Sequence, residues 1–342
     1  MKGEFIHKNI GDGGGATDRF IREEIIERFG NPILNALEDS NLVPTESSHI
    51  LVSTDSFVVS PLFFPNSNIG ALAISGTVND ILASGGIPHY LTLSLIISEG
   101  FPLSDLRKIL ETAKDTAQEC GVKVIAGDTK TVFMGKNAPP TLFINTTGIG
   151  IPIISPQTTF PISESKPGDH LIITGQIGNH GLSVLSTREG LGFEARVHSD
   201  CQPLSSMIIP LVREFPSDIH SMRDPTRGGL AAALVDISQD AHVDIVIDYS
   251  RIPLQKEVEI GCEMLGLDPM ELVNEGKMII VADPDHSHEI LTFLQSHDLG
   301  KESSIIGYLA IPHSSNSKVI LEKNGKKKLI IKKEGIGIPR LC

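Results

Sequence analysis

Tryptophan is absent from this chain, and aromatic residues make up only 5% of it. The cores must therefore be packed by aliphatic side chains, drawn from the 40% of residues that are hydrophobic. The longest apolar runs, such as Tyr90 to Ile97, are too short to cross a bilayer, and the first residues do not resemble a secretory signal peptide. We therefore expect a cytoplasmic protein without a membrane partner.

Cysteine and positive charge are also scarce. Three of the four cysteines, Cys120, Cys201 and Cys262, are far apart and form no C-x-x-C pair, which suits small core residues in a reducing compartment. Lysine and arginine number 29 against 42 acidic residues, so the net charge is −13. This balance argues against nucleic acid as a partner, whereas a nucleotide can bind if metal ions or local lysines neutralise its phosphates.

The usual phosphate-binding loops are missing as well. No Gly-Lys-Ser/Thr follows the glycine run near the N-terminus, and no G-x-G-x-x-G follows a predicted strand. The run itself includes Gly13 and Gly14, whose exposed amide groups could wrap around a phosphate.

With 342 residues the chain is too long for one ordinary core, so two domains are expected. Predicted strands and helices alternate from residue 49 onward, which indicates an α/β class with two sandwiches in tandem. Prolines and serines cluster between residues 152 and 167, and we place the domain boundary there. The predicted parts are a glycine-rich segment with a helix (1–48), a first domain (49–155), a second domain (156–322) and a last strand with a mobile tail (323–342).

The tail ends in a thiol, Cys342. Pro339 prevents a helix there, and Gly335 and Gly337 add backbone freedom. Fully extended, the last ten residues could span on the order of 30 Å, so the tail could serve as a carrier arm. A disordered end without a role is the simpler alternative, whereas a prenyl anchor would require the cysteine four residues from the end.

Four aspartates form a candidate cation site. Asp55, Asp128 and Asp224 stand where predicted apolar strands end, which is where ligands gather in α/β folds, although each alone could be a turn or cap residue. Asp80 lies on a stripe of small and apolar residues in the predicted helix 69–84, where an ionised carboxylate is costly without a partner. Carboxylates without histidine or cysteine ligands favour Mg²⁺ over Zn²⁺. Lys130, two residues after Asp128, is a candidate phosphate contact.

With these stretches in hand, the chain closely resembles the HypE family, the carbamoyl dehydratases that act in [NiFe] hydrogenase maturation. The motifs that carry the resemblance run in order from about residue 50 to the end: Thr54-Asp55-Ser56-Phe57, Gly76-Thr77-Val78-Asn79-Asp80, Gly127-Asp128-Thr129-Lys130, Arg223-Asp224-Pro225-Thr226-Arg227-Gly228-Gly229, Asn274-Glu275-Gly276-Lys277 and Pro339-Arg340-Leu341-Cys342. Relatives usually carry histidine directly before the N-terminal glycine run, whereas Ile10, Gly11 and Asp12 stand there in this chain.

The resemblance implies a fold, a chemistry and partners. The fold would be two tandem PurM-like domains, as in aminoimidazole ribonucleotide synthetase and selenophosphate synthetase, with a homodimer formed through the N-terminal domains. ATP and Mg²⁺ would be needed to remove water from a carbamoyl group on Cys342, leaving the thiocyanate that supplies cyanide to the hydrogenase iron. The carbamoyltransferase HypF would load the thiol, and the HypC–HypD complex would receive the product.

The same resemblance assigns roles to individual residues. Asp55, Asp80 and Asp128 would hold Mg²⁺, with Asp224 as a further candidate for the nucleotide site. Lys130 would lie against the transferred phosphoryl group, and Glu275 would act as the base for the amide protons. Two side chains have simpler interpretations: Arg227 faces phosphate or is a capping and packing arginine, and Glu275 without its motif would be a solvated carboxylate.

Two other functions stay open at this point. One is a sister ATP-dependent enzyme of the same superfamily that acts on a free small molecule. The other is a thiol carrier without catalytic activity, in which Cys342 only transports a group. Asp80→Asn separates the carrier from the enzyme, because a pure carrier would tolerate it.

Overall fold

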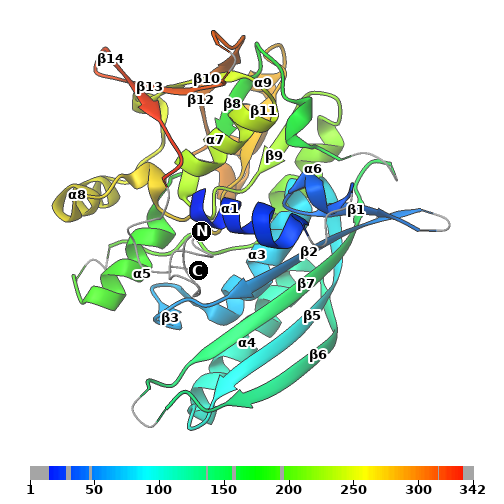
Figure 1. Cartoon of the computed structure of the whole chain (residues 1–342), viewed down its shortest axis with the longest axis vertical. Coiled ribbons are helices and arrows are strands. Elements are labelled where there is room, and N and C mark those ends of the chain that lie inside the picture. Colours follow the sequence, from blue (N-terminus) through cyan, green and yellow to red (C-terminus); the bar gives the residue numbers. More distant parts are fainter. Residues whose placement is uncertain are drawn as a thin grey trace.

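The computed structural model of the chain describes residues 15–27, 32–45, 48–135, 138–155, 159–192, 196–314 and 316–333. Two sheets dominate it, one in each half of the chain (Figure 1). Gly13, Gly14 and Cys342 lie outside the described residues. No helix in the described part of the chain has the length and apolar character that crossing a membrane would require.

The first sheet has five strands in the order β1-β2-β7-β5-β6. Their bounds are β1 Asn41–Pro44, β2 His49–Phe57, β5 Gly86–Ser98, β6 Lys123–Val132 and β7 Leu142–Pro152. All neighbours are antiparallel except β5 and β6, which are parallel. β1 precedes the predicted start of the first domain at residue 49, so part of the segment 1–48 belongs to this sheet.

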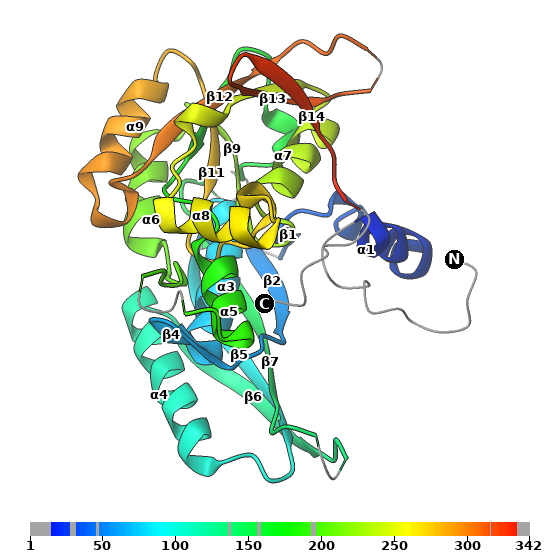
Figure 2. The ribbon, with the colours of Figure 1, turned by 90° about the vertical axis from the view of Figure 1, so that its left-hand side faces the viewer.

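Two helices, α3 (Ile69–Ala83) and α4 (Leu103–Cys120), cover one face of the first sheet (Figure 2). We call this the inner face and the opposite one the outer face. The Asn68 side chain caps α3 by accepting a hydrogen bond from the N–H of Gly70, and Gly121 ends α4 with a φ of 72°. Side chains of β7 alternate between buried inner positions and more exposed outer ones, as expected for a strand with one covered face.

The second sheet has seven strands in the order β14-β13-β10-β12-β8-β11-β9. Their bounds are β8 His170–Ile173, β9 Ile219–Arg223, β10 Asp244–Asp248, β11 Ile279–Ala282, β12 Ser304–Ala310, β13 Val319–Lys323 and β14 Lys326–Ile330. Its buried side chains alternate between two cores: Ile172 and Ile280 face α6 (Ser205–Glu214) and α9 (Ser287–Ser296), whereas Leu171 and Ile279 face α7 (Gly229–Asp240). The second sheet is therefore covered on both faces.

The remaining elements are short or lie between the sheets. They are α1 Gly15–Phe20, the π-helical turn η1 Ile21–Ile26, η2 Leu34–Ala36, the ribbon β3 Phe63–Phe64 with β4 Ser67–Asn68, η3 Ile162–Glu164, α5 Asn179–Glu189, η4 Tyr249–Arg251, α8 Lys256–Leu265, η5 Pro269–Glu271 and η6 Asp298–Gly300. Gly266 adopts a φ of 67° and ends α8, so the chain leaves the helix before η5.

The two halves share apolar cores rather than meeting through a linker. Ile74 and Val78 of α3 pack in one cluster with Leu204 and Met207 at the start of α6, and Leu72 of α3 packs in another with Leu182 of α5. α3 is consequently buried along its whole length. Any polar side chain of α3 therefore lies between the two sheets, and this places the candidate site.

Candidate active site between the two sheets

Asp80 is the buried centre of the candidate site. It lies on α3, is 7% exposed, and accepts a hydrogen bond from Ser53 Oγ at 2.7 Å. Burial raises the pKa of its carboxyl well above the usual value, and the nearby charges of Asp55 and Asp224 raise it further. The predicted burial of this carboxylate on an apolar stripe is confirmed.

Asp55 projects from the inner face of the first sheet toward Asp80. The sequence predicts that the strand ends before this residue, but the strand continues to Phe57, so Asp55 lies inside β2. The strand continues because its polar residues pair with β7, where Asp55 is opposite Thr146. Ser53 and Asp55 share one face, since alternate residues of a strand project to the same side. β2 therefore supplies both a hydrogen-bond donor and a carboxylate to this site.

Asp224 enters from the second sheet, directly after β9. Burial raises the pKa of its carboxyl to about 7; the charge of Asp39 raises it as well, whereas Arg227 and Arg223 lower it. Glu275, between η5 and β11, is 4% exposed, and burial followed by the charge of Asp224 raises its pKa well above the usual value. The structure thus brings Asp224, Glu275 and Arg227 together with Asp55 and Asp80.

Asp39, in the loop before β1, belongs to the same cluster and was missed from the sequence. Its Oδ1 lies 3.7 Å from Nη2 of Arg223, which also lies 3.4 Å from Oδ2 of Asp236. Beside them is a cavity of about 270 Å³, whose lining includes Glu38, Asp39, Arg223, Asp224, Arg227 and Asp236. The adjacent acids Glu38 and Asp39 before a short apolar stretch were the available signal.

Asp128 and Lys130 lie away from the cluster around Asp80 within one chain. The Lys130 ammonium donates to both oxygens of Asp128 at 2.7 Å, and both side chains are more than half exposed. The register runs from Asp55 through β7 and β5 to Gly127, which is three strand spacings or about 14 Å. Because Gly127 pairs onto the inner face, its neighbour Asp128 projects from the outer face. The chain by itself does not bring Asp128 and Lys130 to Asp80.

Comparison with known proteins places both halves of the molecule in one family. Residues 37–152 match the family described as AIR synthase related protein, N-terminal domain, and residues 166–315 match its C-terminal domain. Over 338 residues the chain is 39% identical to the carbamoyl dehydratase HypE of Rhizobium leguminosarum bv. viciae, covering 98% of this chain and 95% of that protein. This chain belongs to the HypE family.

Two solved HypE structures resemble the whole molecule. The structure of a HypE in complex with ATP is 35% identical, with a TM-score of 0.81 over 99% of this chain and 100% of that one. The structure of a HypE–HypF complex is 39% identical, with a TM-score of 0.84 over 92% of this chain and 99% of that one. The family and the fold of two tandem AIR synthase-like domains predicted from the sequence are confirmed.

The carboxylates of this site suit a Mg²⁺ ion that is bound together with a nucleotide. Within the described residues no three carboxylates converge closely enough to form a ready cage for a metal ion. Mg²⁺ is ordinarily bound by one or two carboxylates together with waters and nucleotide phosphates, so such a cage is not needed. Burial raises the pKa values of Asp80, Asp224 and Glu275, and the neighbouring carboxylates raise them further, so a bound cation would favour their ionised forms. The residues present therefore fit a magnesium–nucleotide complex.

Proposed function

We propose that this chain is an ATP-dependent carbamoyl dehydratase whose substrate is a carbamoyl group on its own Cys342. The proposal rests mainly on sequence similarity over nearly the full length: the chain is 39% identical to a carbamoyl dehydratase across 98% of its residues. A relative similar over 99% of the chain has a structure with ATP, which supports ATP as the second substrate. The buried carboxylates between the two sheets supply the place where such chemistry would occur.

The proposed reaction removes an oxygen atom that is a poor leaving group as hydroxide. Transfer of the γ-phosphoryl group to the amide oxygen converts that oxygen into part of a phosphate. The carbon–oxygen bond then breaks, the nitrogen loses its two protons, and the products are the S–C≡N group, ADP and phosphate. The protein's task is to hold the amide oxygen in line with the phosphoryl group and to accept protons.

The residues of the site between the two sheets take distinct parts in this proposal. Asp55, Asp80 and Asp224 would hold Mg²⁺ together with the phosphates, and the ion would neutralise phosphate charge. Arg227, which faces these carboxylates, would contact phosphate oxygens. Glu275 would accept a proton from the amide nitrogen, and its raised pKa makes it a stronger base than an exposed glutamate.

Asp128 and Lys130 can share this site only if a second copy supplies them. They project from the outer face, where Tyr90 and Ile96 of β5 are also exposed, at 45% and 43%. A homodimer that covers this face would bury those apolar side chains and present Asp128 and Lys130 to the site of the partner. The proposed homodimer therefore accounts for both the open outer face and the two separated residues.

The proposal also assigns partners. A homologue of HypF would load the carbamoyl group onto Cys342, since a similar chain has been solved in a HypE–HypF complex. The thiocyanate would then pass its cyanide to the iron of a [NiFe] hydrogenase through the HypC–HypD assembly complex.

Mass spectrometry of the C-terminal peptide tests the proposed reaction. The full-length chain, carbamoylated on Cys342, is incubated with Mg-ATP, and the peptide is expected to lose the mass of one water. If the amide oxygen is labelled with ¹⁸O, the label is expected in the released phosphate. A peptide that keeps its mass while ATP is bound would reject the enzyme and favour a thiol carrier.

A further inference from the structure

The turn that carries Glu275 is fastened to the residues around Asp224. This turn, residues 274–277, is called the Glu275 turn below. The Asn274 side chain is fully buried and donates to the carbonyl oxygen of Pro225 at 3.1 Å. Because Pro225 directly follows Asp224, this bond fixes the spacing between the two carboxylate-bearing segments.

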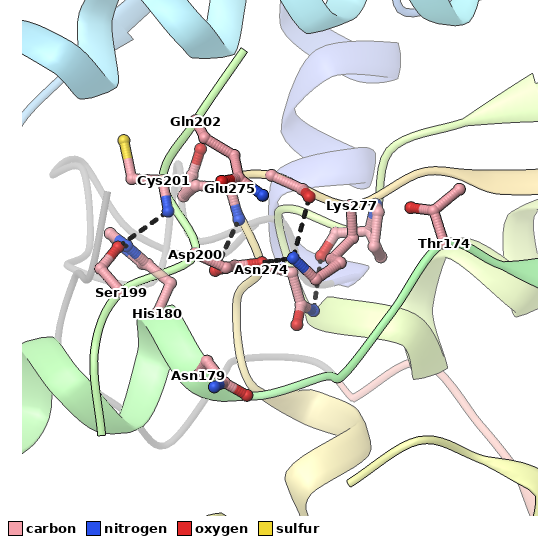
Figure 3. A network of polar contacts seen from close by, with 12 residues as sticks. Thr174, Asn179, His180, Ser199, Asp200, Cys201, Gln202, Asn274, Glu275 and Lys277 are labelled. Carbon is pink, nitrogen blue, oxygen red and sulfur yellow. Dashed lines mark hydrogen bonds and ion pairs between the residues drawn. The ribbon is translucent and has the colours of Figure 1, made fainter. Parts of the chain in front are cut away.

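Asp200 holds the Glu275 turn from a second side. Its Oδ1 accepts a hydrogen bond from the N–H of Glu275 at 3.3 Å, and its Oδ2 lies 3.2 Å from Nζ of Lys277 (Figure 3). Lys277 also donates to the carbonyl oxygen of Gly276 at 3.0 Å. A Cβ on Gly276 would lie 1.9 Å from the Asp200 carbonyl oxygen, so only glycine permits this close contact.

Asn79 of α3 holds the Glu275 turn from the other half of the chain. Its Nδ2 donates to the carbonyl oxygens of Glu275 and Gln202 at 3.1 Å each, and its Oδ1 accepts from the N–H of Leu204 at 2.9 Å. Asn79 is 2% exposed and directly precedes Asp80. The backbone N–H and C=O of Glu275 are thus both bound by side chains, one from each half of the molecule.

These contacts set the position of the carboxylate of Glu275. Among the described residues no group donates a hydrogen bond to that carboxylate, so its place depends on the backbone that carries it. The Asp200 and Lys277 side chains are only 6% and 8% exposed. A buried ion pair is commonly no more stabilising than an apolar pair of the same volume, so stability alone does not explain its presence.

We propose that Asp200, Lys277 and Asn79 are positioning residues that fix Glu275 relative to Asp224 for the dehydration step. This inference rests on the role proposed above for Glu275. A displacement of about 1 Å at a reacting group can lower a rate about 100-fold, which sets the size of the expected effect.

The test removes the two charges together. The double variant Asp200→Leu with Lys277→Met takes away the bond to the Glu275 N–H without leaving a single charge buried. In the full-length carbamoylated chain, we expect water loss at saturating Mg-ATP to slow about 100-fold, with KM for ATP and Tm close to wild type. The conservative pair Asp200→Asn with Lys277→Gln keeps an acceptor for that N–H, and we expect it to restore most of the rate.

A matched control removes a buried pair elsewhere in the same half of the chain. His220 Nδ1 and Asp169 Oδ2 lie 2.8 Å apart with side chains 10% and 4% exposed. The double variant His220→Met with Asp169→Leu is expected to leave the rate of water loss unchanged. A purely structural role for Asp200 and Lys277 would instead lower Tm and weaken ATP binding together with the rate.

Glu275→Gln separates the two possible failures. If Glu275→Gln keeps the wild-type rate, the proposed role of Glu275 is wrong and the positioning inference is overturned with it. If Glu275→Gln stops water loss while the double variant Asp200→Leu with Lys277→Met keeps the wild-type rate, only the positioning inference is overturned. If the double variant Asp200→Leu with Lys277→Met does not fold, Asn79→Leu removes the hydrogen bond to the Glu275 carbonyl oxygen instead. A wild-type rate in that variant contradicts the inference.

Discussion

Asp80 of α3, which covers the inner face of the first sheet, is 7% exposed and lies near Asp55 and Asp224. On the outer face of the same sheet, by contrast, the side chain of Asp128 is 62% exposed and paired with Lys130. Burial raises the pKa of Asp80, while the ammonium of Lys130 and the N–H of Thr129 lower the pKa of Asp128. The same residue type in the same domain thus occupies two opposite electrostatic states.

The difference shows what each face is suited to do. A carboxylate that is buried beside other carboxylates is ionised at a cost, and a bound cation removes that cost. A carboxylate in water beside a lysine needs no cation and gains little from its partner. On the inner side of the sheet a bound cation would therefore favour the ionised form of these carboxylates. The outer face supplies a charged pair that can act only on something docked against it.

The largest expected effect comes from neutralising the inner face. Asp80→Asn keeps the shape of the side chain but removes the buried charge, so we expect a higher Tm in the absence of Mg²⁺ and ATP. We expect the rate of water loss to fall about 10²–10³-fold, because the charge that would hold Mg²⁺ is gone. Thermal unfolding measures the Tm, and peptide mass spectrometry measures the rate of water loss. A variant that is less stable and fully active would contradict the metal role of Asp80.

Mixed dimers sharpen the comparison between the faces. Asp128→Asn and Glu275→Gln are each expected to be nearly inactive as pure dimers. If Asp128 acts in the partner's site, a heterodimer of the two variants has one intact site, and an equimolar mixture should recover about a quarter of the wild-type rate. Recovery is measured after co-refolding or subunit exchange. No recovery would show that Asp128 does not act across the dimer.

Glu38 lines the cavity beside Asp39 and Asp224, and its exposure is intermediate between that of Asp80 and that of Asp128. Burial and the charge of Asp39 raise its pKa from 4.5 to about 7. Between these values the folded chain binds a proton that the unfolded chain does not, so stability falls as pH rises from about 4.5 to about 7. Glu38→Gln removes this fall, and at about pH 8 we expect it to unfold with about 2 kcal/mol more free energy than wild type. Near pH 4 the two should be equally stable in urea titrations, and a gap that is constant at all pH values would show that burial of the Glu38 carboxyl is not its cause.

Much of this arrangement could be predicted from residues near one another in the sequence. The carboxylate on the apolar stripe of α3 could be predicted because a helix repeats its face every three to four residues. The alternation of strands and helices predicted two domains, and their family is now established. Both are local patterns, for which the chain itself holds the information.

The faces of the strands could not be predicted in the same way. Which side of β2 and β6 is covered depends on where α3 and α4 pack, and a shift of one residue moves every side chain to the other face. Asp55 and Asp128 each stand two or three residues after an apolar stretch of the sequence, yet they project from opposite faces. Asp39 was missed for a related reason, because its partner Arg223 comes from the other half of the chain.

The smallest expected effect is on the Tm when the exposed ion pair of the outer face is removed. Lys130→Met removes the partner of Asp128, but both side chains are exposed, and an exposed ion pair contributes little to folding. We therefore expect the Tm of the variant to equal that of wild type at low and high salt, while water loss slows because the partner's site lacks its ammonium. A fall in Tm that disappears at high salt would show instead that the pair serves the fold. In that case the exposed charges of β6 would need no second copy to explain them.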